Sequence, residues 1–167
     1  MQFHTKKISK IAILSAVAIV LQGLENIIII TPIIPGGKVG LANIVTIVSM
    51  QLFGFVPTFI LVIIRTLIGS LLFGGLSSFI YSFAGAVFAL IFMSLSKNIK
   101  GITYIGIGII GAFTNNLGQV LVSCLILKNI SIISYIATLG IISIFTGAII
   151  GLISTYVLNS LEKRGNF

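Results

Sequence analysis

Only a few residues of this sequence could recognise a ligand, and most of them lie inside apolar segments. Arg65 is in the middle of one such segment, and Asn115, Asn116 and Gln119 follow one another in a second. A guanidinium recognises carboxylate or phosphate groups, and a carboxamide both donates and accepts hydrogen bonds. We therefore predict a substrate-binding site for a small molecule, built from Arg65, Asn115, Asn116, Gln119, Lys38, Asn43 and Glu25.

The residues that most enzymes need are missing or present only once or twice. The chain has no aspartate, two glutamates, one histidine, one cysteine and no tryptophan. It contains no G-x-x-x-x-G-K-[S/T] phosphate loop, no cluster of metal-binding side chains, and no histidine beside a candidate serine. We expect a protein that is not an enzyme and that has no catalytic residue, no cofactor and no metal.

The composition is that of a protein that lies in a lipid bilayer. Hydrophobic residues make up 57% of the chain, charged residues 7%, and the mean hydropathy is +1.26. So few polar groups cannot cover an apolar core in water. Because one crossing takes about 20 residues, residues 1–167 predict a single all-α domain, a polytopic bundle of about six transmembrane helices.

Breaks in the apolar pattern predict where these helices begin and end. Pro32, Pro35 and Gly36-Gly37 interrupt the sequence after the first helix and predict a long extracytoplasmic loop. The predicted helices span about residues 8–24, 38–54, 58–73, 77–95, 102–127 and 132–158. Arg65 is then about seven residues into the third helix, about 10 Å along its axis.

The positive charges predict the orientation in the membrane. Seven of them lie at the termini and in the loop after the fourth helix: Lys6, Lys7, Lys10, Lys97, Lys100, Lys163 and Arg164. Only Lys38 and Lys128 lie on the other side. Basic residues are enriched on the cytoplasmic side, so we expect a multi-pass protein of a bacterial plasma membrane with both termini in the cytoplasm. The net charge of +8 is explained in this way without a nucleic acid as partner.

Each candidate site residue also has a purely structural interpretation. Arg65 in a lipid-embedded helix requires a partner or a cavity, and Glu25 is the only acid outside the C-terminal tail. The two could form a structural ion pair, or a pair that a ligand displaces. Asn115 and Gln119 are four residues apart and share a helix face, whereas Asn116 points about 100° away. These amides could instead join helices, and Lys38 could be an interfacial anchor.

Small residues predict where helices approach closely. Gly147-x-x-x-Gly151 and the glycines of the fifth helix are typical of contacts inside a helix bundle. Ala12-x-x-x-Ala16 forms a similar face on the first helix, and its structural interpretation is also internal packing.

Three segments resemble the family called Gx transporter or heptaprenyl diphosphate synthase component I. They are PGGKVGLANIVT at Pro35–Thr46, RTLIGSLLFGG at Arg65–Gly75 and TNNLGQVLV at Thr114–Val122. That family is similar to the S components of energy-coupling factor (ECF) transporters, six-helix proteins that capture vitamins or metal ions at the outer face. The resemblance implies two ATPase subunits and a membrane scaffold subunit as partners, with Ala12 and Ala16 docking on the scaffold.

These observations predict the substrate-binding subunit of an ECF-type uptake transporter for a vitamin or other micronutrient. Its ligand would be small, and lipophilic or anionic. The alternative is an accessory membrane subunit of a prenyl diphosphate synthase in isoprenoid or menaquinone synthesis. A chain without aspartate cannot itself supply the aspartate-rich magnesium site of such a synthase. A third reading, an assembly factor with no ligand, predicts a closed interior with Arg65 fully paired to Glu25.

Overall fold

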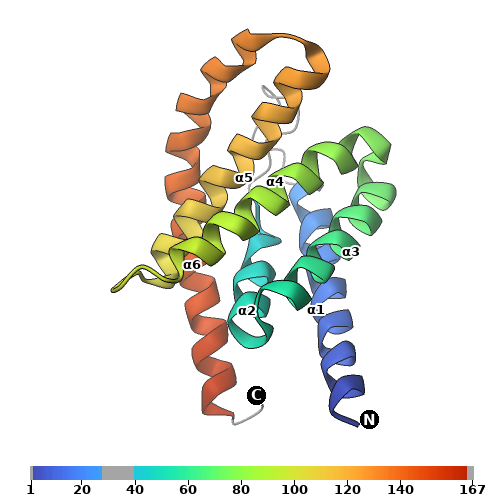
Figure 1. Cartoon of the computed structure of the whole chain (residues 1–167), viewed down its shortest axis with the longest axis vertical. Coiled ribbons are helices and arrows are strands. Elements are labelled where there is room, and N and C mark those ends of the chain that lie inside the picture. The colour runs from blue at the N-terminus through green and yellow to red at the C-terminus, as the bar shows by residue number, and fades with distance from the viewer. Residues whose placement is uncertain (1, 28–39, 165–167) are drawn as a thin grey trace.

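The computed structural model describes residues 2–27 and 40–164, which fold into a bundle of helices (Figure 1). The helices, in chain order, are α1 Gln2–Ile27, α2 Asn43–Phe53, α3 Phe55–Phe73, α4 Gly75–Ser96, α5 Tyr104–Leu127, the short 3-10 helix η1 Ile130–Ser134, and α6 Tyr135–Lys163. The described residues include no strand, and this confirms the all-α class. Every α-helix except α2 is long and apolar enough to cross a membrane.

The second helix is shorter than the sequence predicted. It begins at Asn43 rather than near Lys38, because Gly40 adopts a left-handed conformation with φ of 83° and the chain turns there. The backbone N–H of Asn43 donates a hydrogen bond to the Gly40 carbonyl oxygen across this turn, with an N···O distance of 2.8 Å. Eleven residues extend only about 16 Å, about half of the hydrocarbon thickness. The predicted loop over Ile27–Gly37 lies almost entirely outside the described residues.

Helix α2 is the centre of the bundle. All of its residues from Asn43 to Met50 are buried, and it contacts each of the other five α-helices. Gly54, with φ of 83°, then reverses the chain into α3, where a residue with a side chain would be strained. Pro57 lies in the first turn of α3, where its missing N–H leaves no hydrogen bond unmade.

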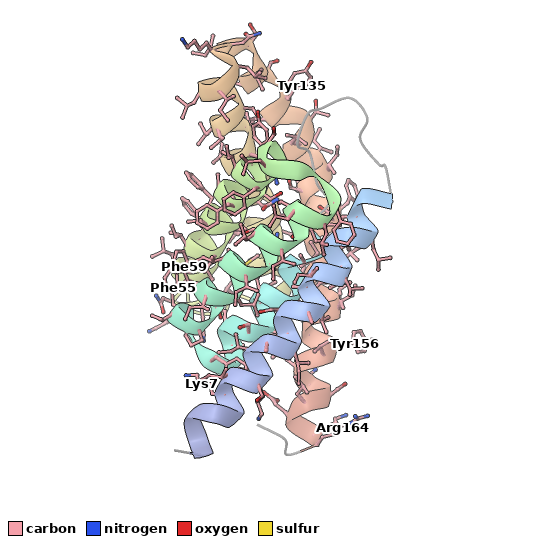
Figure 2. All side chains as sticks on the ribbon, turned by 90° about the vertical axis from the view of Figure 1, so that its right-hand side faces the viewer. Lys7, Phe55, Phe59, Tyr135, Tyr156 and Arg164 are labelled. Carbon is pink, nitrogen blue, oxygen red and sulfur yellow. The ribbon has the colours of Figure 1, made fainter. Side chains whose placement is uncertain are left out.

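Successive helices alternate in direction, so the start of α1 and the end of α6 lie at the same end of the bundle (Figure 1). Figure 2 shows Lys7 and Arg164 together at this end, which we call the terminal end, and Tyr135 at the opposite, distal end. The turn between α4 and α5 lies in the half nearer the terminal end, and the turn after α5 forms the distal tip (Figure 1).

The distribution of polar residues is the reverse of that in a soluble protein. Large apolar side chains such as Ile8, Leu125 and Tyr156 are more than 60% exposed. The buried set includes a guanidinium, a carboxylate and several carboxamides alongside the apolar core. A bilayer solvates the apolar exterior, and polar side chains avoid it by facing inward.

Glycines allow the closest helix contacts, as the sequence predicted. A Cβ added to Gly108 of α5 would collide with the backbone of Gly147 and Gly151 on α6. A Cβ at Gly118 of α5 would lie 3.0 Å from the Gly85 Cα of α4. The positions of α4 and α6 against α5 therefore depend on these small residues.

Candidate functional site

A small polar cavity lies where α1 ends and α2 begins. Five α-helices, α1 to α5, and the turn before α2 contribute to its walls. The lining residues are Gln22 and Glu25 of α1, Gly40 of the turn, Asn43 of α2, Arg65 of α3, Ser82 of α4, and Asn115 and Gln119 of α5. The cavity encloses about 20 Å³. Five of the residues predicted from the sequence thus line a single cavity.

Arg65 occupies the middle of α3. It lies ten residues after Phe55 and eight before Phe73, which places it about 15 Å and 12 Å from the two helix ends. Its side chain is only 5% exposed. The Nη2 group donates a hydrogen bond to Asn43 Oδ1 at 3.3 Å, and Nε has no acceptor in the part of the chain that the structure describes. One N–H group of the guanidinium is therefore available to another acceptor.

Glu25 supplies the negative charge of the cavity. Glu25 is 9% exposed, and its carboxylate accepts a hydrogen bond from the backbone N–H of Leu41, just before α2. It also interacts electrostatically with the Arg65 guanidinium. Glu25 therefore connects the end of α1 with both the turn before α2 and the cation of α3.

The amides of Asn115 and Gln119 face the cavity because α4 approaches α5 closely beside them. A Cβ at Gly85 of α4 would lie 2.9 Å from Asn115 Oδ1 and 2.8 Å from Gln119 Cγ. Gln119 Oε1 has no donor and Asn43 Nδ2 has no acceptor among the described residues. The cavity thus offers an unused acceptor and, with Arg65 Nε, two unused donors.

Asn116 belongs to a different contact. It does not line this cavity, and its Nδ2 donates to Ser143 Oγ of α6 at 3.0 Å. The helical spacing accounts for this, because Asn116 is rotated about 100° from Asn115. Lys38, the remaining predicted residue, lies outside the described residues.

Sequence reasoning missed Gln22 and Ser82. Gln22 packs over Gly69 of α3, where a Cβ would lie 2.7 Å from the Gln22 Cδ atom. It is three residues before Glu25 in an otherwise apolar stretch, and this spacing could have identified it. Ser82 carries no comparable signal, because two other serines, Ser77 and Ser78, precede it in α4.

The cavity is suited to binding a polar or charged group. Its volume admits about one water molecule, which needs about 10–15 Å³ measured in the same way. Within residues 2–27 and 40–164, no three His, Cys, Asp or Glu side chains gather where they could hold a metal ion. The lining groups can form ion pairs and hydrogen bonds, and none of them is a thiol or an imidazole.

Ala12 and Ala16 lie on the outside of the bundle. Both are exposed, whereas Ser15 and Ala18 on the opposite face of α1 are buried. Helix contacts within this chain therefore do not explain the pair of alanines. Docking on a partner protein stays a prediction.

Comparisons with known proteins agree with the resemblance seen in the sequence. The sequence model of a family described as heptaprenyl diphosphate synthase component I matches residues 14–157. No curated protein and no solved structure matches the chain. The match covers α2, α3, α4 and α5 completely and most of α1 and α6. The chain belongs to the heptaprenyl diphosphate synthase component I family of membrane proteins.

Proposed function

We propose that this protein is the substrate-binding membrane subunit, or S component, of an ECF-type micronutrient transporter. The observation that carries the proposal is the buried Arg65, which has an unused Nε beside the unused polar groups of Asn43 and Gln119. A charged side chain in the middle of a membrane helix is costly and is found mainly at functional sites. A bundle with no ligand would be at least as stable if apolar residues replaced both Arg65 and Glu25.

The place of the cavity agrees with capture from outside the cell. Glu25 is two residues before the end of α1 and Asn43 is the first residue of α2, so the cavity lies away from the terminal end. The termini and the α4–α5 turn carry most of the lysines and arginines. If this basic end faces the cytoplasm, the cavity lies toward the extracytoplasmic side.

The cavity must enlarge before a vitamin can enter. Pockets for such ligands measure about 300–1,000 Å³, whereas this one encloses about 20 Å³. The walls of the cavity must therefore move apart for a ligand of that size to bind. The turn at Gly40 forms part of the wall, and the Leu41–Glu25 hydrogen bond connects it to α1.

The hypothesis that the protein is an assembly factor without a ligand explains the same residues less well. That function needs a closed interior, which the small cavity fits, and a fully paired Arg65. The unpaired Nε of Arg65 and the unpaired Oε1 of Gln119 argue against it, because buried polar groups without partners destabilise a protein.

Mass spectrometry of small molecules that purify with the protein tests the proposal. The unmodified protein, Arg65→Ala and Asn116→Ala are purified into lipid nanodiscs, and their extracts are compared. Asn116→Ala is a matched control, because Asn116 is 5% exposed like Arg65 but bonds to Ser143 outside the cavity. We expect a compound enriched with the unmodified protein and the control and lost with Arg65→Ala. Identical extracts from all three proteins would contradict the proposal.

The family description favours a second candidate, an accessory membrane subunit of a prenyl diphosphate synthase. In that role a separate catalytic chain would hold the magnesium and the diphosphate, since this chain has no aspartate. The test is the rate of prenyl transfer by the catalytic chain from the same cell, measured with and without this protein. A several-fold increase would support the accessory role, and an unchanged rate would exclude it.

A further inference from the structure

Two residues of opposite charge line the polar cavity. Arg65 and Glu25 are the charged side chains among its described lining residues, and the others are amides, a serine and a glycine. Among the described lining residues, these two charges cancel. A ligand that brings a further charge into it must therefore be accompanied by a change at Arg65 or Glu25.

The Glu25 carboxylate has a hydrogen-bond partner other than Arg65, whereas no other acidic residue lines the described cavity to neutralise Arg65. The Glu25 carboxylate already accepts a hydrogen bond from the Leu41 N–H, and it lies near the end of α1. Arg65 is fixed far from either end of α3 and cannot reach water by a small movement. When the cavity opens, Glu25 is therefore the charge that can move away, and Arg65 is the charge that stays.

We propose, on the basis of the proposed function, that the ligand is an organic monocarboxylate whose carboxylate replaces Glu25 as the counter-ion of Arg65. The ligand's carboxylate takes the unused Nε–H of Arg65, in the side-on arrangement that a guanidinium offers to a planar acid. Asn43 Nδ2 is a further donor for it. Glu25 is then the residue that determines the ligand's charge.

The charge balance favours a carboxylate over a phosphate. With Glu25 displaced, the described cavity contains one positive charge, and one carboxylate neutralises it. A phosphate monoester carries about −1.5 to −2 at neutral pH and would leave an excess of negative charge in a low-dielectric site. A neutral amide would leave Arg65 without a counter-ion.

Four probes of similar shape test this inference: 4-fluorobenzoate, 4-fluorobenzamide, 4-fluorobenzamidine and 4-fluorophenyl phosphate. Their binding to the protein in nanodiscs of zwitterionic lipid is measured by fluorine NMR line broadening. On the unmodified protein we expect the benzoate to bind at least tenfold more tightly than the other three. Equal or tighter binding of the amide, the amidine or the phosphate overturns the inference, and this comparison requires no variant.

The same titrations with two variants test the exchange itself. Glu25→Gln removes the competing charge but keeps an oxygen that can accept from Leu41, so we expect benzoate to bind at least tenfold more tightly than to the unmodified protein. Arg65→Gln should abolish benzoate binding, while Asn116→Ala should leave it unchanged. If Glu25→Gln weakens benzoate binding or binds no probe at all, Glu25 does not compete with the ligand and the inference is wrong.

Failure of this inference differs from failure of the proposed function. If a neutral or cationic compound purifies with the protein and is lost in Arg65→Ala, the binding function stands and the monocarboxylate is wrong. If no compound depends on Arg65 and benzoate does not bind, both are wrong.

Discussion

The buried, opposite charges of Arg65 and Glu25 give the sharpest prediction about stability. Both residues are buried, with exposed fractions of 5% for Arg65 and 9% for Glu25. Removing one member of such a pair leaves an uncompensated charge and costs about 3–5 kcal/mol, whereas removing both is often close to neutral. We therefore expect Arg65→Gln and Glu25→Gln each to destabilise the protein, and the double variant to be more stable than either.

The size of the effect follows from this asymmetry. If the two costs were independent, the double variant would lose about 6–10 kcal/mol, twice the cost of one broken pair. For the double variant to be more stable than either single variant, coupling between the two charges must recover more than the cost of one substitution, which is at least about 3 kcal/mol. In a chain of this length about 1 kcal/mol corresponds to about 2–4 °C, so the recovery amounts to at least about 6 °C.

Thermal unfolding in nanodiscs, followed by circular dichroism, measures these differences. Glu162→Gln and Arg164→Gln are matched controls, because both residues are exposed at the end of α6 and should change stability by less than about 0.5 kcal/mol. Additive losses in the double variant would show that the Arg65 and Glu25 charges do not depend on each other. The accounts of ion pairing and of ligand exchange would then both be wrong.

Three further predictions concern packing, partner contact and orientation. Gly147→Ala should destabilise the α5–α6 contact by about 1–3 kcal/mol, because the added Cβ would lie 2.7 Å from a backbone carbonyl oxygen of α5. Gly140→Ala is the control in the same unfolding assay and should be tolerated, because the atom nearest to its added Cβ would be 3.4 Å away. Ala16→Leu should leave the melting temperature unchanged, because Ala16 is exposed, and should weaken co-purification of a scaffold subunit. In a cysteine-free background, a membrane-impermeant maleimide should label Asn129→Cys in intact cells and Ile99→Cys only after permeabilisation.

Each of these has an outcome that contradicts it. Equal melting temperatures for the two glycine variants would mean that α5 and α6 are not in close contact. Unchanged capture of a scaffold by Ala16→Leu would remove this face of α1 from the interface. Labelling of Ile99→Cys in intact cells would reverse the orientation and place the cavity toward the cytoplasm.

Much of the site could be predicted because lipid leaves polar side chains few places to lie. Arg65, Asn43 and Gln119 occur in apolar segments, and each had to face the interior of the bundle. Once five helices surround a short central one, residues at similar depth on their inner faces must meet. This physical requirement accounts for the convergence of the predicted residues on one cavity.

The rest depended on details that apolar periodicity does not encode. The left-handed turn at Gly40 shortens α2, although a glycine in that position is equally compatible with a continuing helix. Asn116 bonds to Ser143 because of how α6 is placed by its glycines. The volume of the cavity depends on contacts such as Gln22 over Gly69, which only the packed structure fixes.

A high-resolution structure of the protein purified from its own membranes, with no ligand added, tests the central claim most directly. We predict density for a non-protein molecule within hydrogen-bond distance of Arg65 Nε and Gln119 Oε1, in a cavity several times larger than 20 Å³. A cavity of unchanged size that holds one water molecule, with the Glu25 carboxylate still beside Arg65, would contradict it.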